Sequence, residues 1–553
     1  MAGAVSAGAY TAGVLDFLIE ALDEWYAAKE RGEAVPMHDI SIDVFSGASA
    51  GGMCAAIAAV QAQEDFEHIR DTSRTGTSNR FYEAWVNKID IRQLLQKQDL
   101  QAGQPVISLL DSTIIKTIAE YALTPGAVKP RQYISPRLTL FLTLTNLRGL
   151  SYSLKDLSPD SLDTAETASL EETTSYYADR LRFETVQPGS TASGANAKPL
   201  PIGQAGSGAW PLLRAAAMAT GAFPIFLAPR ELERAVDDYQ PPIWDPIYPP
   251  SNDPEIWPNW PYKQNTGATW RTLNVDGGVI DNDPFDLAHD YLASCDPPTG
   301  GVNPQTPSEA DRAVITVAPF PSYDPFDAKF ECAQCAGIFS AASRLFTALI
   351  SQSRFFGESL AMIMTGRVFS RFVIAPSDAQ LPRGIPALQC AALGAFGGFF
   401  ERGFRAHDYL LGRRNCQRFL QTQFILPEGN PIIKAGLDAL GSRRDVVLES
   451  MGMDPPNKRV TPQDQRWIPL IPLCGTAASA MLRPPRAEMS DSDLSKVVDL
   501  IATRYRALLP LLVADVPSAP ARMMIRLAGN VMSLFVKGKL EAYLRAQLQV
   551  NRA

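Results

Sequence analysis

The 553-residue chain has few cysteines, few histidines and no long apolar run. Its seven cysteines are an odd number in a long chain, which excludes the dense, even-numbered disulfide framework of a small secreted domain and favours a reducing compartment. No Lys or Arg precedes Lys29, so the basic region that opens a secretory signal is missing and we expect no export signal. The most apolar run, 387–400, is shorter than the roughly 20 residues of a membrane-spanning helix, so we expect none.

The chain also lacks an excess of basic residues, because 51 Lys and Arg stand against 59 Asp and Glu and the net charge is −8. This balance does not favour binding to a polyanion, so we expect no nucleic-acid partner. The 46% hydrophobic and 20% charged residues are ordinary values for a globular protein. The length accommodates several domains or one large enzyme domain with insertions.

The order of elements in the first 330 residues predicts an α/β fold. A helical period over 11–29 is followed by a strand pattern at 40–45 and by an Ala-rich helical stretch at 53–60. Further strand patterns lie at 138–144, 271–275 and 313–318, with helical patterns between them. This alternation predicts a sheet with helices on both faces, that is, three α/β/α layers.

Two segments of different composition interrupt this pattern, and the pattern changes after residue 330. Segment 151–208 is polar and is expected to lie on the surface and pack little, whereas the Pro- and Trp-rich segment 237–270 is expected to be an ordered loop, serving either as a lipid-facing lid or as a simple anchor. We therefore predict an α/β domain over 1–330 with insertions near these two segments, and a helical region over 331–553. Its helical patterns cover 338–365, 399–423, 433–442, 491–514 and 519–549.

The sharpest local motif is Gly47-Ala48-Ser49-Ala50-Gly51, which lies between the strand at 40–45 and the following helix. A tight turn in this context exposes the Ser hydroxyl, so Ser49 is a candidate nucleophile. The first amides of the helix and its dipole would then stabilise an oxyanion at the same place. The alternative is a small-residue turn without activity.

A nucleophilic Ser needs a base, and the chain has only four histidines to supply an imidazole. None of them lies in a turn-rich context typical of a catalytic loop, so we expect each to be a surface or packing residue. Asp276 differs, because it ends the strand at 271–275 and opens the turn Asp276-Gly277-Gly278, at the sheet edge where Ser49 should emerge. Its alternative role is to cap that turn. The histidines are His38, His68, His289 and His407.

These motifs, in this order, resemble the patatin-like phospholipases. The turn Gly47 to Gly51 is similar to the family's G-x-S-x-G, and Asp276-Gly277-Gly278 is similar to its D-G-[AG]. Segment 214–229, with its small residues and its Phe223-Pro224, resembles the family's helix and Pro-containing loop between these two motifs. The resemblance implies an α/β sheet with a nucleophile elbow and a Ser-Asp dyad, in which Ser49 attacks and Asp276 is the base, with no metal and no cofactor.

The resemblance extends to the amino-terminal residues, where the family has a G-G-G-x-[KR]-G turn whose amides form the oxyanion hole. Here the sequence is Gly3-Ala4-Val5-Ser6-Ala7-Gly8, in which two glycines and the basic residue are replaced. The resemblance implies that the amides of Gly3, Ala4 and Val5 hold the oxyanion, because main-chain N–H groups survive the loss of Gly if φ permits.

Two features lie downstream. Short blocks between 396 and 415 resemble a block of some bacterial patatin-related proteins, and we expect their polar groups to form buried hydrogen bonds between the helical region and the α/β domain. Cys332-Ala333-Gln334-Cys335 has zinc or redox spacing, but no second pair stands nearby, so we expect neither use. The blocks are Phe396-Gly397-Gly398-Phe399, Phe404-Arg405, His407-Asp408-Tyr409 and Gly412-Arg413-Arg414-Asn415.

The resulting hypothesis is a serine acyl hydrolase of lipid esters, a phospholipase A or lysophospholipase that uses Ser49 and Asp276. The alternatives are a Ser-His-Asp esterase with His289 or His407, and a catalytically silent membrane-associated scaffold. The partner would be a phospholipid or another lipid ester. Residues 501–553 hold eight basic and two acidic side chains, which fit either docking on anionic lipid or a packed helix with a solvated face. We therefore expect a cytoplasmic protein in peripheral contact with the inner face of the membrane.

Overall fold

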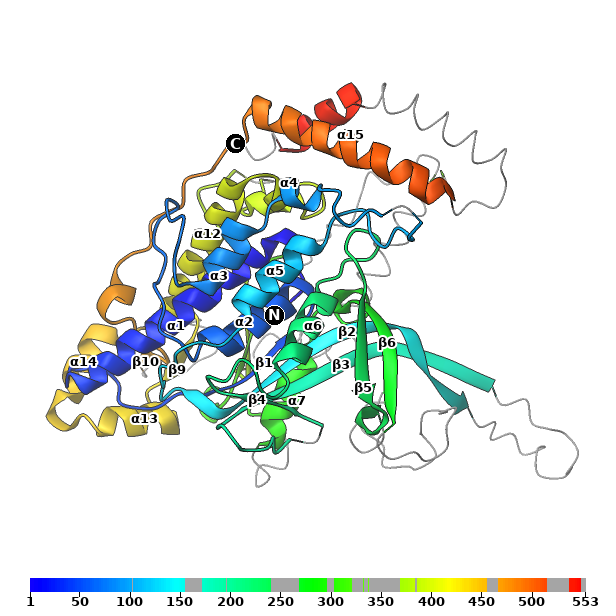
Figure 1. Ribbon diagram of the computed structural model, residues 1–553. Coiled ribbons are helices and arrows are strands. Elements are labelled where there is room, and N and C mark those ends of the chain that lie inside the picture. The colour runs from blue at the N-terminus through cyan, green and yellow to red at the C-terminus, as the bar shows by residue number, and fades with distance from the viewer. Residues whose placement is uncertain are drawn as a thin grey trace, which may run out of the picture.

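A computed structural model gives the fold (Figure 1). It describes residues 1–101, 103–154, 172–194, 196–239, 268–295, 303–320, 332, 337, 369–382, 385–454, 466–514 and 537–548.

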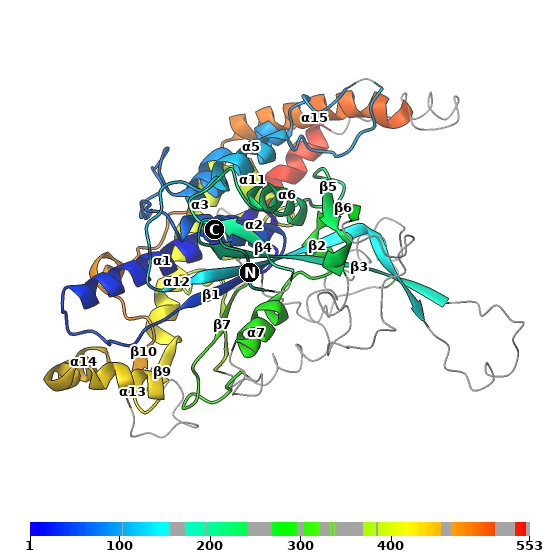
Figure 2. The same ribbon diagram turned by 60° about the horizontal axis from the view of Figure 1, so that its bottom comes forward.

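A mixed six-stranded sheet lies at the centre of the molecule (Figures 1 and 2). Its strand order is β4-β3-β2-β6-β5, and β1 also pairs with β2. The strands are β1 (Ile42–Gly47), β2 (Ile134–Leu154), β3 (Glu172–Val186), β4 (Lys198–Pro201), β5 (Arg230–Ala235) and β6 (Thr269–Asp276).

The long strand β2 brings the ends of β1 and β6 together. Strand β3 runs antiparallel along one edge of β2, so β1 and β6 share the other edge. Strand β1 is parallel to β2 and ends with Gly47 opposite Leu142, whereas β6 is antiparallel and ends with Asp276 opposite Leu144. The two strands therefore point toward each other, and the residues that follow them meet.

Helices cover both faces of the sheet, which confirms the predicted three-layer α/β/α fold. Helices α2 (Ser49–Gln61) and α6 (Trp210–Thr220) pack on one face, and α7 (Phe285–Ser294) packs on the other (Figure 2). Helix α1 (Gly8–Glu30) lies against α2. Beside α2 and α6 lie three shorter helices, α3 (Arg80–Tyr82), α4 (Ile91–Leu94) and α5 (Thr113–Ala122), with a π-helical turn at Glu83–Lys88.

Helix α12 (Arg402–Thr422) packs along α1 and joins the helical region to the α/β domain. The helices cross where glycines allow close approach, because a Cβ at Gly13 would lie 1.9 Å from the Tyr409 carbonyl oxygen and one at Gly412 would lie 2.2 Å from that of Tyr10. One buried apolar cluster contains residues of both helices.

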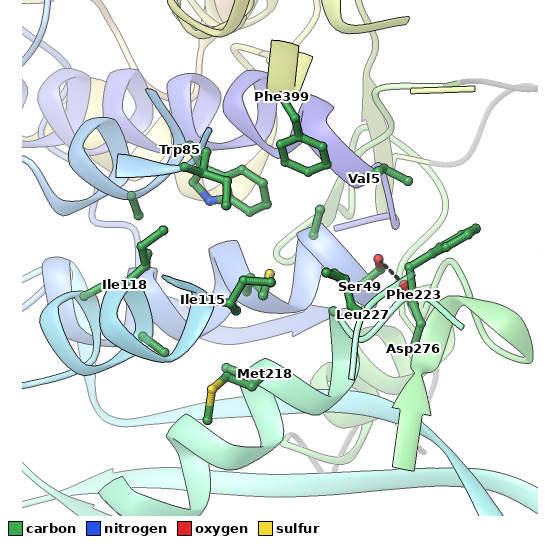
Figure 3. A pocket seen from close by; sticks show the side chains of 18 of the residues that line it. Val5, Ser49, Trp85, Ile115, Ile118, Met218, Phe223, Leu227, Asp276 and Phe399 are labelled. Atoms are coloured by element: carbon green, nitrogen blue, oxygen red, sulfur yellow. Dashed lines mark hydrogen bonds between the residues drawn. The ribbon is translucent and has the colours of Figure 1, made fainter. Parts of the chain in front are cut away.

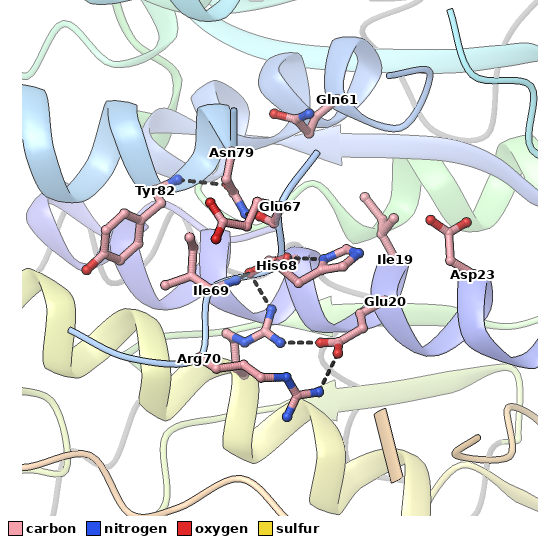
Figure 4. A network of polar contacts seen from close by, with 12 residues as sticks. Ile19, Glu20, Asp23, Gln61, Glu67, His68, Ile69, Arg70, Asn79 and Tyr82 are labelled. Atoms are coloured by element: carbon pink, nitrogen blue, oxygen red, sulfur yellow. Dashed lines mark hydrogen bonds and ion pairs between the residues drawn. The ribbon is translucent and has the colours of Figure 1, made fainter. Parts of the chain in front are cut away.

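Polar groups of α12 reach buried carboxylates on α1 and form a network (Figure 4). Arg413 pairs with both Asp16 and Glu20, and the Tyr409 hydroxyl donates to Asp16 at 2.8 Å. From the other side, Arg70 pairs with Glu20. The predicted role of the 407–415 block in buried hydrogen bonding is confirmed.

Two small sheets and further helices complete the described part of the chain. Strands β7 (Val314–Val317) and β8 (Arg371–Ile374) form a parallel pair, and β9 (Ile425–Pro427) pairs with β10 (Trp467–Pro469). Helix α15 is followed by another helical stretch at 537–548. The remaining named helices are α11 (Gly397–Phe400), α13 (Pro431–Asp438), α14 (Arg444–Met451) and α15 (Asp491–Ala514).

The first two residues connect the central sheet to the β7–β8 pair. The Met1 ammonium donates to the Ser46 carbonyl at 2.9 Å, and the Met1 carbonyl accepts from the Ala48 amide. The Ala2 amide donates to the Val317 carbonyl of β7. Burial lowers the pKa of this ammonium. Met1 also lines a largely apolar cavity of about 1640 Å³, open space at its mouth included, between β1 and β7.

Several sequence expectations need correction. Within segment 151–208, the described residues of β3 and β4 are no surface excursion, because both strands lie in the central sheet and the apolar side chains of Leu181 and Phe183 are buried there. Residues 155–171 of the segment lie outside the described residues. The strand pattern at 313–318 is β7, which pairs with β8 in a separate sheet. Most of the loop at 237–270, the helix expected at 338–365 and most of that at 519–549 lie outside the described residues.

One helical stretch of the described chain, Val5–Glu30, is long and apolar enough to cross a bilayer by length and composition. Of its most apolar window, 89% is buried inside the fold. This burial, with α2 and α12 packed against the stretch, is typical of a core helix.

Candidate active site

Ser49 sits in a strained turn between β1 and α2, as the motif predicts. Its φ is +52°, which directs the side chain out of the turn and is unusual for a residue other than Gly. The Ser49 amide donates to the Thr220 hydroxyl at 2.9 Å, and this bond fixes the turn against α6.

Asp276 accepts a hydrogen bond from the Ser49 hydroxyl, with 2.6 Å between Oγ and Oδ2 (Figure 3). Its other oxygen accepts from the Gly278 amide at 2.7 Å. Burial raises the pKa of the Asp276 carboxyl to about 7, and the bonds from Ser49 and Gly278 oppose that rise. The carboxyl is therefore matched to proton transfer near neutral pH.

The glycines of both motifs lie where another backbone comes close. A Cβ would lie 2.6 Å from Gly51 backbone atoms at Gly47, 2.3 Å from the Met1 carbonyl oxygen at Gly51, and 2.2 Å from the Thr143 carbonyl oxygen at Gly277. Gly278 donates to Asp276, as described above. The amino-terminal residues, β2 and the two motifs are thus packed at backbone distance around Ser49.

A deep apolar pocket opens at Ser49 and Asp276 (Figure 3). It encloses about 890 Å³, open space at its mouth included. Apart from Ser49 and Asp276, the described lining residues are apolar, aromatic or glycine, and they come from both regions of the chain. Those labelled in Figure 3 are Val5, Trp85, Ile115, Ile118, Met218, Phe223, Leu227 and Phe399. Such a lining suits a hydrocarbon chain.

Comparison with known proteins gives the same family as the motifs. The family model described as patatin-like phospholipase matches residues 1–289. The chain belongs to the patatin-like phospholipase family. It is also 32% identical over 588 residues to an uncharacterized protein, y4iI, of Sinorhizobium fredii (strain NBRC 101917 / NGR234), an alignment that covers 99% of this chain and 80% of that protein. The family supports lipid acyl hydrolysis as the general activity.

The residues that match the family's amino-terminal glycine turn differ from it in sequence and make hydrogen bonds of their own. The Gly3 amide donates to the Asn282 carbonyl at 3.1 Å, so it is not a free donor, and the expectation for Gly3 needs correction. The amides of Ala4 and Val5 have no hydrogen-bond partner among the described residues. The Ser6 hydroxyl accepts from the Gly398 amide at 3.1 Å and anchors the turn to the helical region.

Val5 has a φ of +47°, a conformation that favours Gly and is costly for a β-branched residue. We expect Val5→Gly to leave the melting temperature unchanged or raise it, because Gly removes strain of about 1–3 kcal/mol. The control is Val14→Gly in buried α1, which should lower stability by about 2–4 kcal/mol. Scanning fluorimetry measures both, and equal losses would refute strain at Val5.

All four histidines are described, and none lines the pocket. His38 bonds to the Leu470 carbonyl, and burial lowers its pKa to about 4. His68 pairs with Asp16 at 2.6 Å. His289 and His407 each pair with the Asp that follows it. These positions match the expected packing roles.

No cluster of metal-ligating side chains occurs in the part of the chain that the structure describes. Six described cysteines are unpaired. Cys335 lies outside the described residues, so the Cys332 to Cys335 motif cannot be placed.

Sequence reasoning missed three contributors to the site. Thr220 and Asn282 position the elbow and the amino-terminal turn, but neither belongs to a motif. Phe396 and Phe399 line the pocket, although their block was assigned only a packing role. The apolar spacing of Ile114, Ile115 and Ile118 would have predicted an amphipathic helix, but not its position beside Ser49.

Proposed function

We propose that the protein hydrolyses an acyl ester bond of phospholipids, with Ser49 as nucleophile and Asp276 as general base. The observation that carries this proposal is the 2.6 Å hydrogen bond between them at the mouth of a pocket lined by hydrocarbon side chains. A phospholipid offers both an ester carbonyl for the hydroxyl and an acyl chain for the pocket.

The reaction proceeds in two steps. Asp276 takes the Ser49 proton while Oγ attacks the ester carbonyl, and the free amides of Ala4 and Val5 donate to the developing oxyanion. Collapse of the tetrahedral intermediate breaks the ester C–O bond, and Asp276 returns the proton to the departing alcohol. Asp276 then activates a water molecule, which releases the fatty acid and restores Ser49.

The surroundings of Asp276 suit both steps. The Gly278 amide and the bond from the Thr145 hydroxyl to the Asp276 carbonyl hold the carboxylate in place. The apolar pocket excludes water beside it, which keeps its pKa high enough to accept a proton and to return it.

Fatty acid release from mixed phospholipids and neutral lipids tests the proposal. We expect release from phospholipid by the unaltered chain and none by Ser49→Ala, which keeps the pocket. Release from neutral lipids alone would contradict the phospholipid assignment. An organophosphonate that phosphonylates serine, with Oγ displacing the leaving group on phosphorus, should label Ser49, and failure to label it would favour the silent scaffold.

The dependence of kcat/KM on pH should report the ionisation of Asp276, the proposed general base. Because Asp276 must be deprotonated to accept a proton and its pKa is raised to about 7, kcat/KM should fall as pH is lowered through about 7. Asp281 provides the control, since burial and the nearby Asp283 and Asp286 also raise its pKa to about 7. Asp281→Asn should keep the acidic limb. If the acidic limb disappears in Asp281→Asn, the titration belongs to Asp281 and not to Asp276.

A further inference from the structure

Strained backbone surrounds the mouth of the pocket. Six described residues other than Gly have positive φ, and five of them lie at the site: Val5, Ser49, Ile225, Leu393 and Ala395. Val5 and Ser49 line the pocket, and Ile225 lies between the lining residues Phe223 and Leu227. Ala395 directly precedes the lining residue Phe396, and Leu393 lies three residues before it. Strain of this kind persists where the surrounding structure imposes it.

At this mouth, two hydrogen-bonded segments expose large apolar side chains. The Leu109 amide donates to the Ile225 carbonyl at 2.9 Å, and the Leu110 amide donates to the Phe226 carbonyl at 3.0 Å. On these segments Ile225 is 70% exposed, Ile107 61% and Phe226 37%. We call these three residues the apolar tip.

The apolar tip is continuous with the pocket. Leu110, Phe223 and Leu227, neighbours of the tip residues in sequence, line the pocket. The ring of Phe226 lies 5.1 Å from that of Phe396 and 5.9 Å from that of Phe223, between centroids. An apolar path thus leads from the exposed side chains to Ser49.

Ile225 has two features that raise the free energy of the folded chain, and no burial within the chain offsets them. Its φ of +72° is strained for a β-branched residue, and its side chain is nevertheless directed into water. A surface that is rigidly held, apolar and exposed is typical of an interaction site.

We propose that the apolar tip inserts into the surface of a phospholipid bilayer and so places the pocket mouth against its substrate. The role given to this insertion, delivery of substrate to the pocket, rests on the proposed function. A bilayer fits because an acyl chain has to leave hydrocarbon and enter the pocket, and the tip provides an unbroken apolar route. The insertion is hydrophobic, so it does not depend on lipid charge.

Three of the eight basic residues of 501–553 pair with acidic side chains in the part of the chain that the structure describes. The buried Arg504 pairs with Asp99 at 2.7 Å, Lys537 pairs with Asp499, and Arg545 pairs with Asp491 at 2.6 Å. These three pairs reduce the positive charge that the described part of 501–553 offers to anionic lipid.

Vesicle flotation in the Ser49→Ala background tests the tip independently of catalysis. The probe is a vesicle of uncharged phosphatidylcholine at 0.1 M and about 1 M salt. We expect the Ser49→Ala protein to float at both salt concentrations, and we expect Ile107→Asn with Ile225→Asn to weaken binding by at least about tenfold. Asn tolerates positive φ, so Ile225→Asn should fold, and Ile225→Gly provides a second variant that fits the same backbone.

The matched control is Val446→Asn, a 53% exposed apolar residue on α14, which lies at the lower left edge of the molecule in Figure 1, away from α5 and α6. It should float as well as its parent. Absent flotation, binding lost at high salt, or equal binding by the tip variant would each overturn the proposal. So would a tip variant that turns a dimer into a monomer, which would assign the tip to self-association. If the protein floats but the unaltered chain releases no fatty acid, the proposed function is wrong, whereas the proposal that the apolar tip inserts into a bilayer still holds.

Discussion

Replacing Ser49 by Ala, or Asp276 by Asn, should lower lipid hydrolysis by about 10⁴-fold or more, whereas replacing all four histidines should change it only a few-fold. The first variant removes the nucleophile, and the second keeps the shape of the base but cannot accept a proton. The histidines should be dispensable because each bonds away from the pocket, as His68 does with Asp16. Turnover of a phospholipid substrate measures all three.

Stability separates a chemical loss from a folding defect. Burial disfavours the charged form of Asp276 and raises the pKa of its carboxyl from an ordinary 3.8 to about 7. The stability that the neutral carboxyl contributes is therefore fully present below pH 3.8, and it is lost as pH rises through about 7. Asp276→Asn should therefore raise the free energy of unfolding at pH 8, by up to about 4 kcal/mol, with the gain vanishing toward pH 4. Near-normal turnover in Asp276→Asn, or a single His variant as inactive as Ser49→Ala, would show that the Ser-Asp dyad is wrong and would favour a Ser-His-Asp triad.

Arg413→Met should lower the free energy of unfolding by about 3–5 kcal/mol, the largest stability effect that we expect from one buried contact of α12. The substitution keeps the length of the side chain but leaves Asp16 and Glu20 without their shared buried cation. Burial acts to raise the pKa of Asp16, and Arg413, His68 and Tyr409 outweigh it, so loss of Arg413 exposes the cost of burying this charge. Urea unfolding measures the change.

An exposed ion pair provides the control. Lys434 pairs with Asp438 on the surface of α13, and Lys434→Met should leave the free energy of unfolding almost unchanged. Adding Asp16→Asn and Glu20→Gln to Arg413→Met should restore part of the lost stability, because the buried charges are then gone. Equal effects of Arg413→Met and Lys434→Met would mean that the network does not hold α12 on α1.

The sequence predicted those parts of the site that are coded by contiguous residues. The elbow at Ser49 and the turn at Asp276 each need glycines within a few positions, and such closely spaced glycines can be recognised in the sequence alone. Their meeting was expected because both turns follow strands that end at the same sheet edge. In the structure β6 runs antiparallel to β2 and meets β1 end to end, because β2 is long enough to pair with both.

The parts that escaped prediction depend on contacts between distant segments. Segment 151–208 has the composition of a surface excursion, yet β3 uses the alternate apolar residues Leu181 and Phe183 to pack within the sheet, and its polar residues Asp179 and Glu184 are buried as well. The pocket wall combines α5 with Phe396 and Phe399, which are more than 250 residues apart in sequence. Neither composition nor periodicity encodes which distant apolar faces meet.

The position of Met1 has a practical consequence for producing the protein. Its ammonium and carbonyl are bonded to Ser46 and Ala48, and its carbonyl oxygen lies against Gly51, on the turn that carries Ser49. A shortened version of the protein without residues 1 and 2 would lose these contacts, and any displacement of the turn would pass directly to the nucleophile. Assays on such a version would underestimate turnover, although Ser49 and Asp276 are unchanged.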